Sequence, residues 1–477
     1  MIKWVRRELD TIYGPVRNIF FGVEDAPADG ETPDGAAPSA ARGRAPDAVP
    51  LTASEEDELA SELESAEGLL GAVLWNSNLA ALRHLHHHVF ARHPRVQANL
   101  RQPRGPPLAG LTVVELGAGV GSLGIALARA GATVLVTDLP DLYPLMSANR
   151  KLNAAQIAAG QAPPPDDGGP SPQHGGGRCE VLGWRWGPTD TIGLNPHKRL
   201  RQRESGAAKA AKQQKHTERS SSSGGGGGGG PADVASVVRD MLQDLAAPSQ
   251  SCQAAARLLF KGRPPPHRVD YVVMCDALYG NPKDWPALLY TLSEILLVLH
   301  QGDPRDAGVA PPQGCQIINF CEQRVRNVEA QFLALLHSQN EKNEQRYRAY
   351  SAPRGTATAA WREAVRADMI ARLAETIQDR QKEDILMAAV DLQQLRALSP
   401  APADGGGMRY WNWKRSEMEE EKSELGMPIF VTEMTLGTTR GDSLLIVDPS
   451  TAPTPTDGER TAAAAAPQKK EKRPRND

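Results

Sequence analysis

A carboxylate stands directly before a glycine-rich loop in the segment VVELGAGVGSLG, residues 113–124. Glu115 lies near the end of a short apolar run, and the glycines that follow include Gly117, Gly119, Gly121 and Gly124. Glycine lets a backbone approach a ligand closely. A carboxylate at this place repels a pyrophosphate but attracts an ammonium or sulfonium group. The segment therefore predicts a loop that binds a positively charged ligand.

The same loop can also be interpreted as a dinucleotide site. Read from Gly119, it satisfies G-x-G-x-x-G, and Asp138 lies close to the distance expected for a ribose-binding acid. Glu115 favours a different ligand, S-adenosylmethionine, which carries an amino group, a sulfonium, a ribose diol and adenine but no phosphate. We expect Glu115 at its amino-acid end and Asp138 at its ribose hydroxyls.

Alternating strand-like and helix-like segments must position these residues. Strand patterns precede helical ones along most of the chain, and two strand-like pieces close it: 111–116, 122–132, 133–138, 142–155, 269–276, 285–300, 315–321, 327–339, 428–435 and 443–448. Repeated βα units followed by a hairpin predict an α/β fold with a doubly wound, mostly parallel seven-stranded sheet and a C-terminal antiparallel hairpin. Long low-complexity insertions interrupt it.

At this point the sequence resembles the class I, Rossmann-like methyltransferases, whose first motif is an acid followed by G-x-G-x-G. Further segments are similar to the seven-β-strand protein-lysine methyltransferases outside the SET fold, called family 16. They are GAVLWNSNLAALRHL with Trp75, MSANRKLN with Asn149 and Asn153, EVLGWRWG with Trp186 or else Trp184, VDYVVMCDALYG with Asp276 and Tyr279, and IINFCEQR with Arg324. The resemblance covers roughly residues 66–190 and 267–338 and, more weakly, 427–448.

The resemblance implies S-adenosylmethionine as cofactor and in-line methyl transfer to a deprotonated lysine amine of a protein substrate. Its cofactor-binding residues would be Trp75, Glu115, Gly117, Gly119, Gly121, Asp138, Trp186 and Asp276, and its catalytic residues Asp276 and Tyr279. Structural alternatives stay open: the two aspartates as helix caps, and the aromatic residues as core side chains. Arg324 serves substrate or structure equally well.

Other functions remain open alternatives. The acceptor could be a protein histidine or a small molecule, and the fold could be a non-catalytic interaction scaffold. A dehydrogenase ranks below these. The cluster HLHHHVFARH, residues 84–93, lacks partner ligands, so we expect a solvated helix face and no metal site.

Composition sets the domain boundaries. We expect an amphipathic N-terminal segment over 1–23, helical or else a transit peptide, and a linker over 24–53. The methyltransferase domain would span 54–449, with insertions at about 188–266 and 340–426, and a basic tail would occupy 450–477. The helical stretch 361–398 reads as an insertion packed on the domain surface, or else as a partner-binding helix.

The overall charge bears on partners and location. A formal net charge of −3 over 477 residues favours neither nucleic acid nor a membrane surface as partner. Five cysteines without paired spacing indicate a reducing compartment. We therefore expect a cytoplasmic protein, or a nuclear one if the lysines and arginines of the tail act as an import signal.

Overall fold

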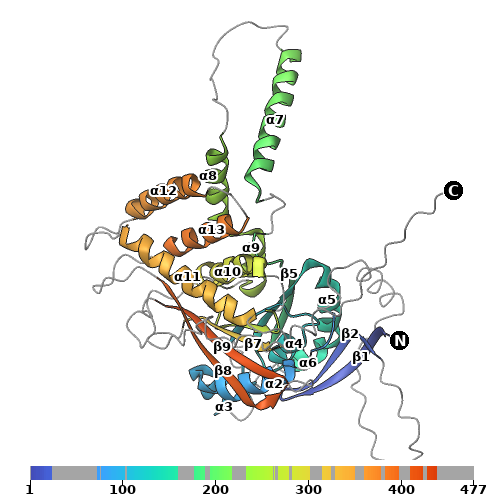
Figure 1. The fold of residues 1–477 in the computed structure, drawn as a ribbon. Coiled ribbons are helices and arrows are strands. Elements are labelled where there is room, and N and C mark those ends of the chain that lie inside the picture. The colour runs from blue at the N-terminus through green and yellow to red at the C-terminus, as the bar shows by residue number, and fades with distance from the viewer. Residues whose placement is uncertain are drawn as a thin grey trace, which may run out of the picture. The chain divides into compact units, whose positions relative to one another are not determined.

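The structure of the chain is a computed structural model (Figure 1). The residues described are 2–23, 72–75, 77–101, 105–159, 177–188, 194–217, 233–261, 263, 267–278, 282–300, 314–323, 328–349, 359–377, 382–396, 409–422 and 427–437. The chain divides into a unit over 1–444 and a second over 445–477, and the latter lies outside the described residues. No helix among the described residues has the length and apolar character needed to cross a membrane.

A seven-stranded sheet in the order β5-β4-β3-β6-β7-β9-β8 forms the centre of the first unit. Neighbours from β5 to β7 pair in parallel, whereas β9 pairs antiparallel with both β7 and β8. The strands are β3 (Thr112–Leu116), β4 (Thr133–Asp138), β5 (Arg178–Gly183), β6 (Tyr271–Cys275), β7 (Gln316–Glu322), β8 (Tyr410–Lys422) and β9 (Pro428–Gly437). This confirms the predicted doubly wound, mostly parallel sheet and its C-terminal hairpin.

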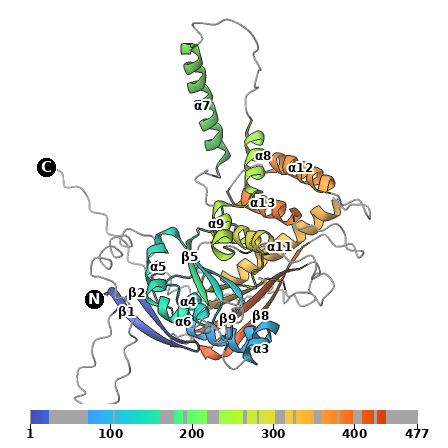
Figure 2. The same cartoon turned by 180° about the vertical axis from the view of Figure 1, so that it is seen from behind.

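Both faces of the sheet are covered, because alternate side chains of the central strands are apolar. On β3, Val113 packs into one core cluster and Val114 into the other. Helices α4 and α5 contact β4 and β5 from one side, and α9 contacts the same strands from the other (Figures 1 and 2). These helices are α4 (Ser122–Arg129), α5 (Tyr143–Leu152) and α9 (Gln250–Leu259). The first face also carries α2 (Ser77–His84), α3 (Pro94–Leu100) and α6 (Ala154–Ala159).

The N-terminal segment is a β-hairpin and not the expected helix. Strands β1 (Ile2–Thr11) and β2 (Gly14–Val23) pair antiparallel along their whole length around a turn at Ile12 and Tyr13. Gly14 adopts φ of 94°, which favours glycine at this corner. Val16, Ile19 and Phe20 of β2 are buried in the core cluster that includes α4 and α5. Burial of this strand against the domain, rather than helix propensity, decides the conformation.

The first insertion contains packed helices rather than only loose sequence. Helix α7 spans Pro196–Thr217 and α8 spans Val234–Leu245. Asp233 caps α8 by accepting a hydrogen bond from the Ser236 N–H at 2.6 Å, and Ser249 caps α9 in the same way through Cys252 at 3.1 Å. Buried residues on α8 and α9 belong to the main core cluster, which makes this part of the insertion structural.

The second insertion is likewise part of the core. It comprises the end of α11 (Val328–Ala349), then α12 (Ala359–Thr376), α13 (Lys382–Arg396) and the strand β8. The expected helix over 361–398 is thus two helices, and α13 packs on α10 (Trp285–Glu294) with its apolar face fully buried. The hairpin partner of β9 is β8 and not the predicted piece 443–448, which lies outside the described residues.

Candidate functional site

The glycine loop joins β3 to α4 at the carboxyl end of the sheet. Gly117, Gly119 and Gly121 have φ of 69°, 57° and 79°, a left-handed conformation that L-residues adopt at a cost. A Cβ at Gly117 would come within 3.0 Å of Ala277 Cβ. The alternating glycines therefore serve both the turn and a close contact with the end of β6. In open α/β sheets this edge is the ligand-binding edge.

Asp138 at the end of β4 fastens the loop. Its Oδ2 accepts a hydrogen bond from Gly119 N–H at 2.7 Å, and its Oδ1 accepts one from Leu139 N–H at 2.6 Å. Burial raises the pKa of the Asp138 carboxyl, and these two hydrogen bonds oppose the rise. Each carboxylate oxygen can accept further hydrogen bonds. Because Asp138 also lines a pocket, it has the acceptors that a ribose diol requires.

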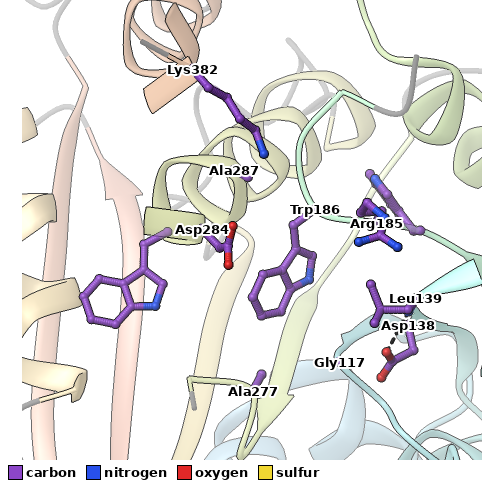
Figure 3. A pocket seen from close by; sticks show the side chains of 11 residues that line it. Gly117, Asp138, Leu139, Arg185, Trp186, Ala277, Asp284, Ala287 and Lys382 are labelled. Atoms are coloured by element: carbon purple, nitrogen blue, oxygen red, sulfur yellow. Dashed lines mark hydrogen bonds between the residues drawn. The ribbon is translucent and has the colours of Figure 1, made fainter. Parts of the chain in front are cut away.

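A pocket of about 260 Å³ opens beside the loop (Figure 3). Its lining residues come from the ends of β3, β4, β5 and β6 and from two helices: Gly117, Asp138, Leu139, Trp184, Arg185, Trp186, Ala277, Asp284, Trp285, Ala287 and Lys382. Trp186 is partly exposed, whereas Trp184 is buried with 1% of its surface exposed. Trp186 therefore has more exposed surface at this pocket than Trp184, and its contact with adenine stays a prediction.

Glu115 lies beneath the loop and not on the lining of this pocket. Only 2% of its surface is exposed, and its Oε2 accepts a hydrogen bond from the Gly124 N–H in the first turn of α4 at 2.9 Å. Burial raises the pKa of Glu115 to about 8, with a further contribution from the charge of Asp138. The structure thus supplies the partner that an acid in an apolar strand needs. Contact between Glu115 and a cofactor's amino group stays a prediction.

Asp276 follows β6 and is the one non-glycine residue with positive φ, 52°, in the described part of the chain. Its Oδ1 accepts a hydrogen bond from Glu322 N–H at 2.7 Å, and its Oδ2 accepts one from the Ser77 hydroxyl at the start of α2. Its own N–H donates to Phe320 O at 2.8 Å. Strained residues fixed in this way cluster at functional sites. Asp276 therefore joins β6, β7 and α2 at the edge where ligands bind, next to the pocket residue Ala277.

The other predicted residues are placed less directly. Trp75 is half-buried and just precedes α2, and its carbonyl accepts a hydrogen bond from Asn78 N–H at 3.3 Å. It does not line the pocket beside Gly117. Tyr279 and Arg324 lie outside the described residues. Their predicted roles remain predictions.

Asn149 and Asn153 bind the N-terminal hairpin. The Asn153 carboxamide pairs with Arg17, accepting from its N–H at 2.9 Å and donating to its carbonyl at 2.7 Å. Asn149 pairs in the same way with Ile19 and also donates to Val120 O in the glycine loop at 2.9 Å. The two spaced asparagines thus continue the hydrogen bonding of the free edge of β2.

The histidine segment lacks a metal site among the residues that the structure describes. Its outer members His87 and His88 are exposed, as expected of a solvated face. His93 is instead buried, and its Nδ1 accepts a hydrogen bond from Arg95 N–H at 3.2 Å. His86 Nδ1 lies 3.1 Å from the hydroxyl of Tyr13 in the hairpin turn. Some histidines of the segment therefore pack against the domain, whereas others face solvent.

Several residues of the site were not predicted from the sequence. Ser77 lies in the segment GAVLWNSNLAALRHL two residues after Trp75. Its position at the start of a helix is the only feature of the sequence that indicates a role for it. Arg185 lies between the two tryptophans of β5's end. Asp284 is the N-cap of α10 and Lys382 begins α13, and no local motif connects either residue with the glycine loop.

Comparisons with known proteins bear on the family of the chain. Residues 53–161 match the sequence family described as lysine methyltransferase, which confirms the resemblance drawn from the motifs. No curated protein matches the chain in sequence. Together with the sheet order and the glycine loop, the family match supports an S-adenosylmethionine-dependent methyltransferase.

Two solved structures show a distant likeness. One is magnesium protoporphyrin IX methyltransferase from Synechocystis PCC 6803 with bound SAH, at 11% identity and TM-score 0.24 over 79% of this chain and 93% of that chain. The other is a putative Zn-dependent alcohol dehydrogenase from Rhodobacter sphaeroides, at 10% identity and TM-score 0.23 over 76% of this chain and 100% of that chain. TM-scores this low say nothing about function.

Proposed function

We propose that the chain is a protein-lysine N-methyltransferase that uses S-adenosylmethionine. The observation that carries this proposal is the pocket in which the glycine loop, the Asp138 carboxylate and the partly exposed Trp186 side chain meet. Those groups suit a ligand with a ribose diol and a flat base. The family match over 53–161 supports lysine as the acceptor.

The residues of the pocket fit this cofactor. The Asp138 carboxylate would accept hydrogen bonds from the ribose hydroxyls, and Trp186 would stack on the adenine. Gly117 leaves the space that a side chain would fill next to Ala277. When bound, S-adenosylmethionine supplies an activated methyl group on a sulfonium.

The acceptor requires positioning more than strong base catalysis. A lysine amine has an ordinary pKa near 10.4 and reacts only in its neutral form. Asp276 is held by the Ser77 hydroxyl and the Glu322 N–H, so its carboxylate has a fixed orientation at the sheet edge. We infer that Asp276 orients the incoming amine, with Tyr279 bounding the same channel. In-line geometry and exclusion of water would then accelerate the transfer of the methyl group to the amine.

The test has two stages and uses the full chain. Calorimetry with S-adenosylhomocysteine should show binding to the wild type, and Asp138→Ala should weaken it by about tenfold or more, consistent with the loss of charge-assisted hydrogen bonds. No binding to the wild type would exclude the proposed cofactor and leave the scaffold alternative.

The second stage identifies the acceptor. Cell extract is incubated with labelled S-adenosylmethionine and the purified enzyme, and the methylated residue is located by mass spectrometry. Asparagine tolerates the same left-handed backbone, so Asp276→Asn removes the charge of the carboxylate without straining the turn. Methyl-lysine that forms with the wild type and disappears with Asp276→Asn therefore supports the proposal. Methylated histidine or a methylated small molecule would instead refute lysine specificity.

A further inference from the structure

We propose that Lys382 and Asp284 together recognise the polar edge of the adenine, so that the second insertion of the chain completes the cofactor site. This inference rests on the proposed function, because it assumes that S-adenosylmethionine occupies the pocket. It adds a binding contribution from α13, an element that no motif of the sequence connects with the loop.

Both residues line the same pocket as Gly117 and Asp138. Figure 3 shows the Lys382 side chain directed into the pocket, with Lys382 and Ala277 at opposite ends of the Trp186 indole. Asp284 lines the same pocket, and in the view of Figure 3 its carboxylate lies on the side of Trp186 opposite to Asp138. A base stacked on Trp186, with its ribose on Asp138, would therefore turn its outer edge toward Lys382 and Asp284.

The polar groups of these two side chains are available to a ligand. Asp284 occupies the N-cap position of α10 but makes no capping hydrogen bond, although aspartate is among the best N-cap residues. Lys382 is exposed at the first position of α13. Within the described ranges, neither side chain has a hydrogen bond or ion pair to another residue.

The insertion holds Lys382 in place through a buried anchor. Ile385 and Ala389 of α13 have no exposed surface, and Leu386 has 1%. They belong to the core cluster that includes Leu288 and Leu292 of α10, and the two helices are in extensive contact. Asp284 directly precedes α10 as its N-cap and Lys382 begins α13, so this packing fixes the separation of the backbone positions of the two charged residues. A lysine on a mobile loop would lack such preorganisation.

The chemistry of the pair fits adenine. The outer edge of adenine carries an amino group that donates and a ring nitrogen that accepts. The Asp284 carboxylate accepts and the Lys382 ammonium donates, which matches this edge. A different assignment is that Lys382 binds the carboxylate of the cofactor's amino-acid end. The two assignments predict different behaviour toward a ligand without that carboxylate.

The test measures affinity for S-adenosylhomocysteine and for 5′-methylthioadenosine, which retains the base and ribose but has no carboxylate. We expect Lys382→Met to weaken the binding of both ligands about five- to tenfold, as lost hydrogen bonds from a partly solvated charged donor would. Asp284→Asn should weaken both in the same range. Lys342→Met makes the same chemical change at an exposed helical lysine away from the pocket, and it should leave both affinities unchanged.

The outcomes separate the two proposals. If wild type binds neither ligand, the proposed function fails and this inference fails with it. If wild type binds and Lys382→Met binds both ligands equally well, the proposed function stands and the inference is overturned. If Lys382→Met weakens the binding of S-adenosylhomocysteine but not of 5′-methylthioadenosine, Lys382 binds the amino-acid end of the cofactor. This result would also overturn the inference. Circular dichroism and the thermal midpoint of each variant confirm that the fold is retained.

Discussion

The carboxamide of Asn149 pairs with both backbone groups of Ile19, accepting from its N–H at 2.6 Å and donating to its carbonyl at 3.0 Å. One side chain on α5 therefore substitutes for a neighbouring strand at the edge of β2. Because the same nitrogen also reaches Val120 O, the N-terminal hairpin and the glycine loop share one buried link.

Asn149→Ala should destabilise the fold and weaken the cofactor site. Removing the carboxamide leaves buried backbone groups of Ile19 and Val120 without their partner, at a cost of about 1–3 kcal/mol per group, not strictly additive. Urea unfolding should show the loss of stability, and calorimetry should show weaker binding of S-adenosylhomocysteine.

Asn153→Ala is the matched control, because Asn153 binds the hairpin at Arg17 without contacting the loop. It should lower stability while leaving the affinity for S-adenosylhomocysteine near that of the wild type. Equal losses of affinity in both variants would contradict a specific link from Asn149 to the loop.

The stability of the ligand-free protein should fall as the pH rises from about 5 to about 8. Burial raises the pKa of Glu115 to about 8, so over this range the native state holds a proton that the unfolded chain has released. A single such group lowers the free energy of unfolding by at most about 1.4 kcal/mol per pH unit. The raised pKa of Asp138 acts in the same direction.

Glu115→Gln should reduce this pH dependence, since glutamine keeps an oxygen for the Gly124 N–H and does not ionise. Urea unfolding of both proteins at several pH values measures the difference. Calorimetry on the same variant tests the sequence prediction: a large loss of cofactor affinity supports contact with the ligand's amino group, and unchanged affinity limits Glu115 to bracing α4.

Gly124→Ala should destabilise the protein although alanine favours helices. A Cβ at this position would lie 2.6 Å from Val136 Cγ2 and would also meet Glu115 Oε2. Overpacking of this kind costs about 1–3 kcal/mol. Thermal unfolding would record it. A midpoint at or above that of the wild type would show that α4 can move away from β3.

Ser77→Ala should slow turnover without impairing cofactor binding. It removes the hydroxyl that donates to Asp276 Oδ2 and leaves the Glu322 N–H on Oδ1. If Asp276 must be oriented to position the acceptor, kcat should fall by about tenfold while the affinity for S-adenosylhomocysteine is retained. Steady-state kinetics with the identified substrate would measure this.

Ser122→Ala provides the comparison for Ser77. Ser122 is also buried at the start of a helix, but its hydroxyl donates to Asn18 Oδ1 at 2.7 Å, away from Asp276. Its loss should cost stability and leave kcat unchanged. If Ser77→Ala behaves like Ser122→Ala, the hydroxyl of Ser77 has only a structural role.

The sequence predicted the half of the pocket whose residues are close to strand ends. Asp138 ends a recognisable strand and Gly117 and Trp186 follow such strands, and parallel strands bring their carboxyl ends to one edge. Lys382 could not be found this way. Its place depends on the packing of α13 against α10, a contact between segments far apart in the chain that periodicity does not encode.

The prediction of an N-terminal helix over 1–23 was wrong for a related reason. The charged, partly alternating sequence of this segment suits an amphipathic helix almost as well as a strand. Burial of the apolar side chains of β2 against the domain decides its conformation, and the carboxamides of Asn149 and Asn153, more than 100 residues away along the chain, also pair with its backbone. The helices α8 and α9, by contrast, carried local signals in their caps, Asp233 and Ser249, which the neighbouring low-complexity sequence obscured.

The backbone of Asp276 limits which residues can replace it. At φ of 52°, asparagine and glycine are accommodated with little strain, whereas other side chains cost about 1–2 kcal/mol. Glutamate would keep the charge, but its extra methylene would move the carboxylate away from the Glu322 N–H while its backbone resisted the turn. Asp276→Glu, usually regarded as a conservative exchange, would therefore disturb the structure of this turn more than Asp276→Asn.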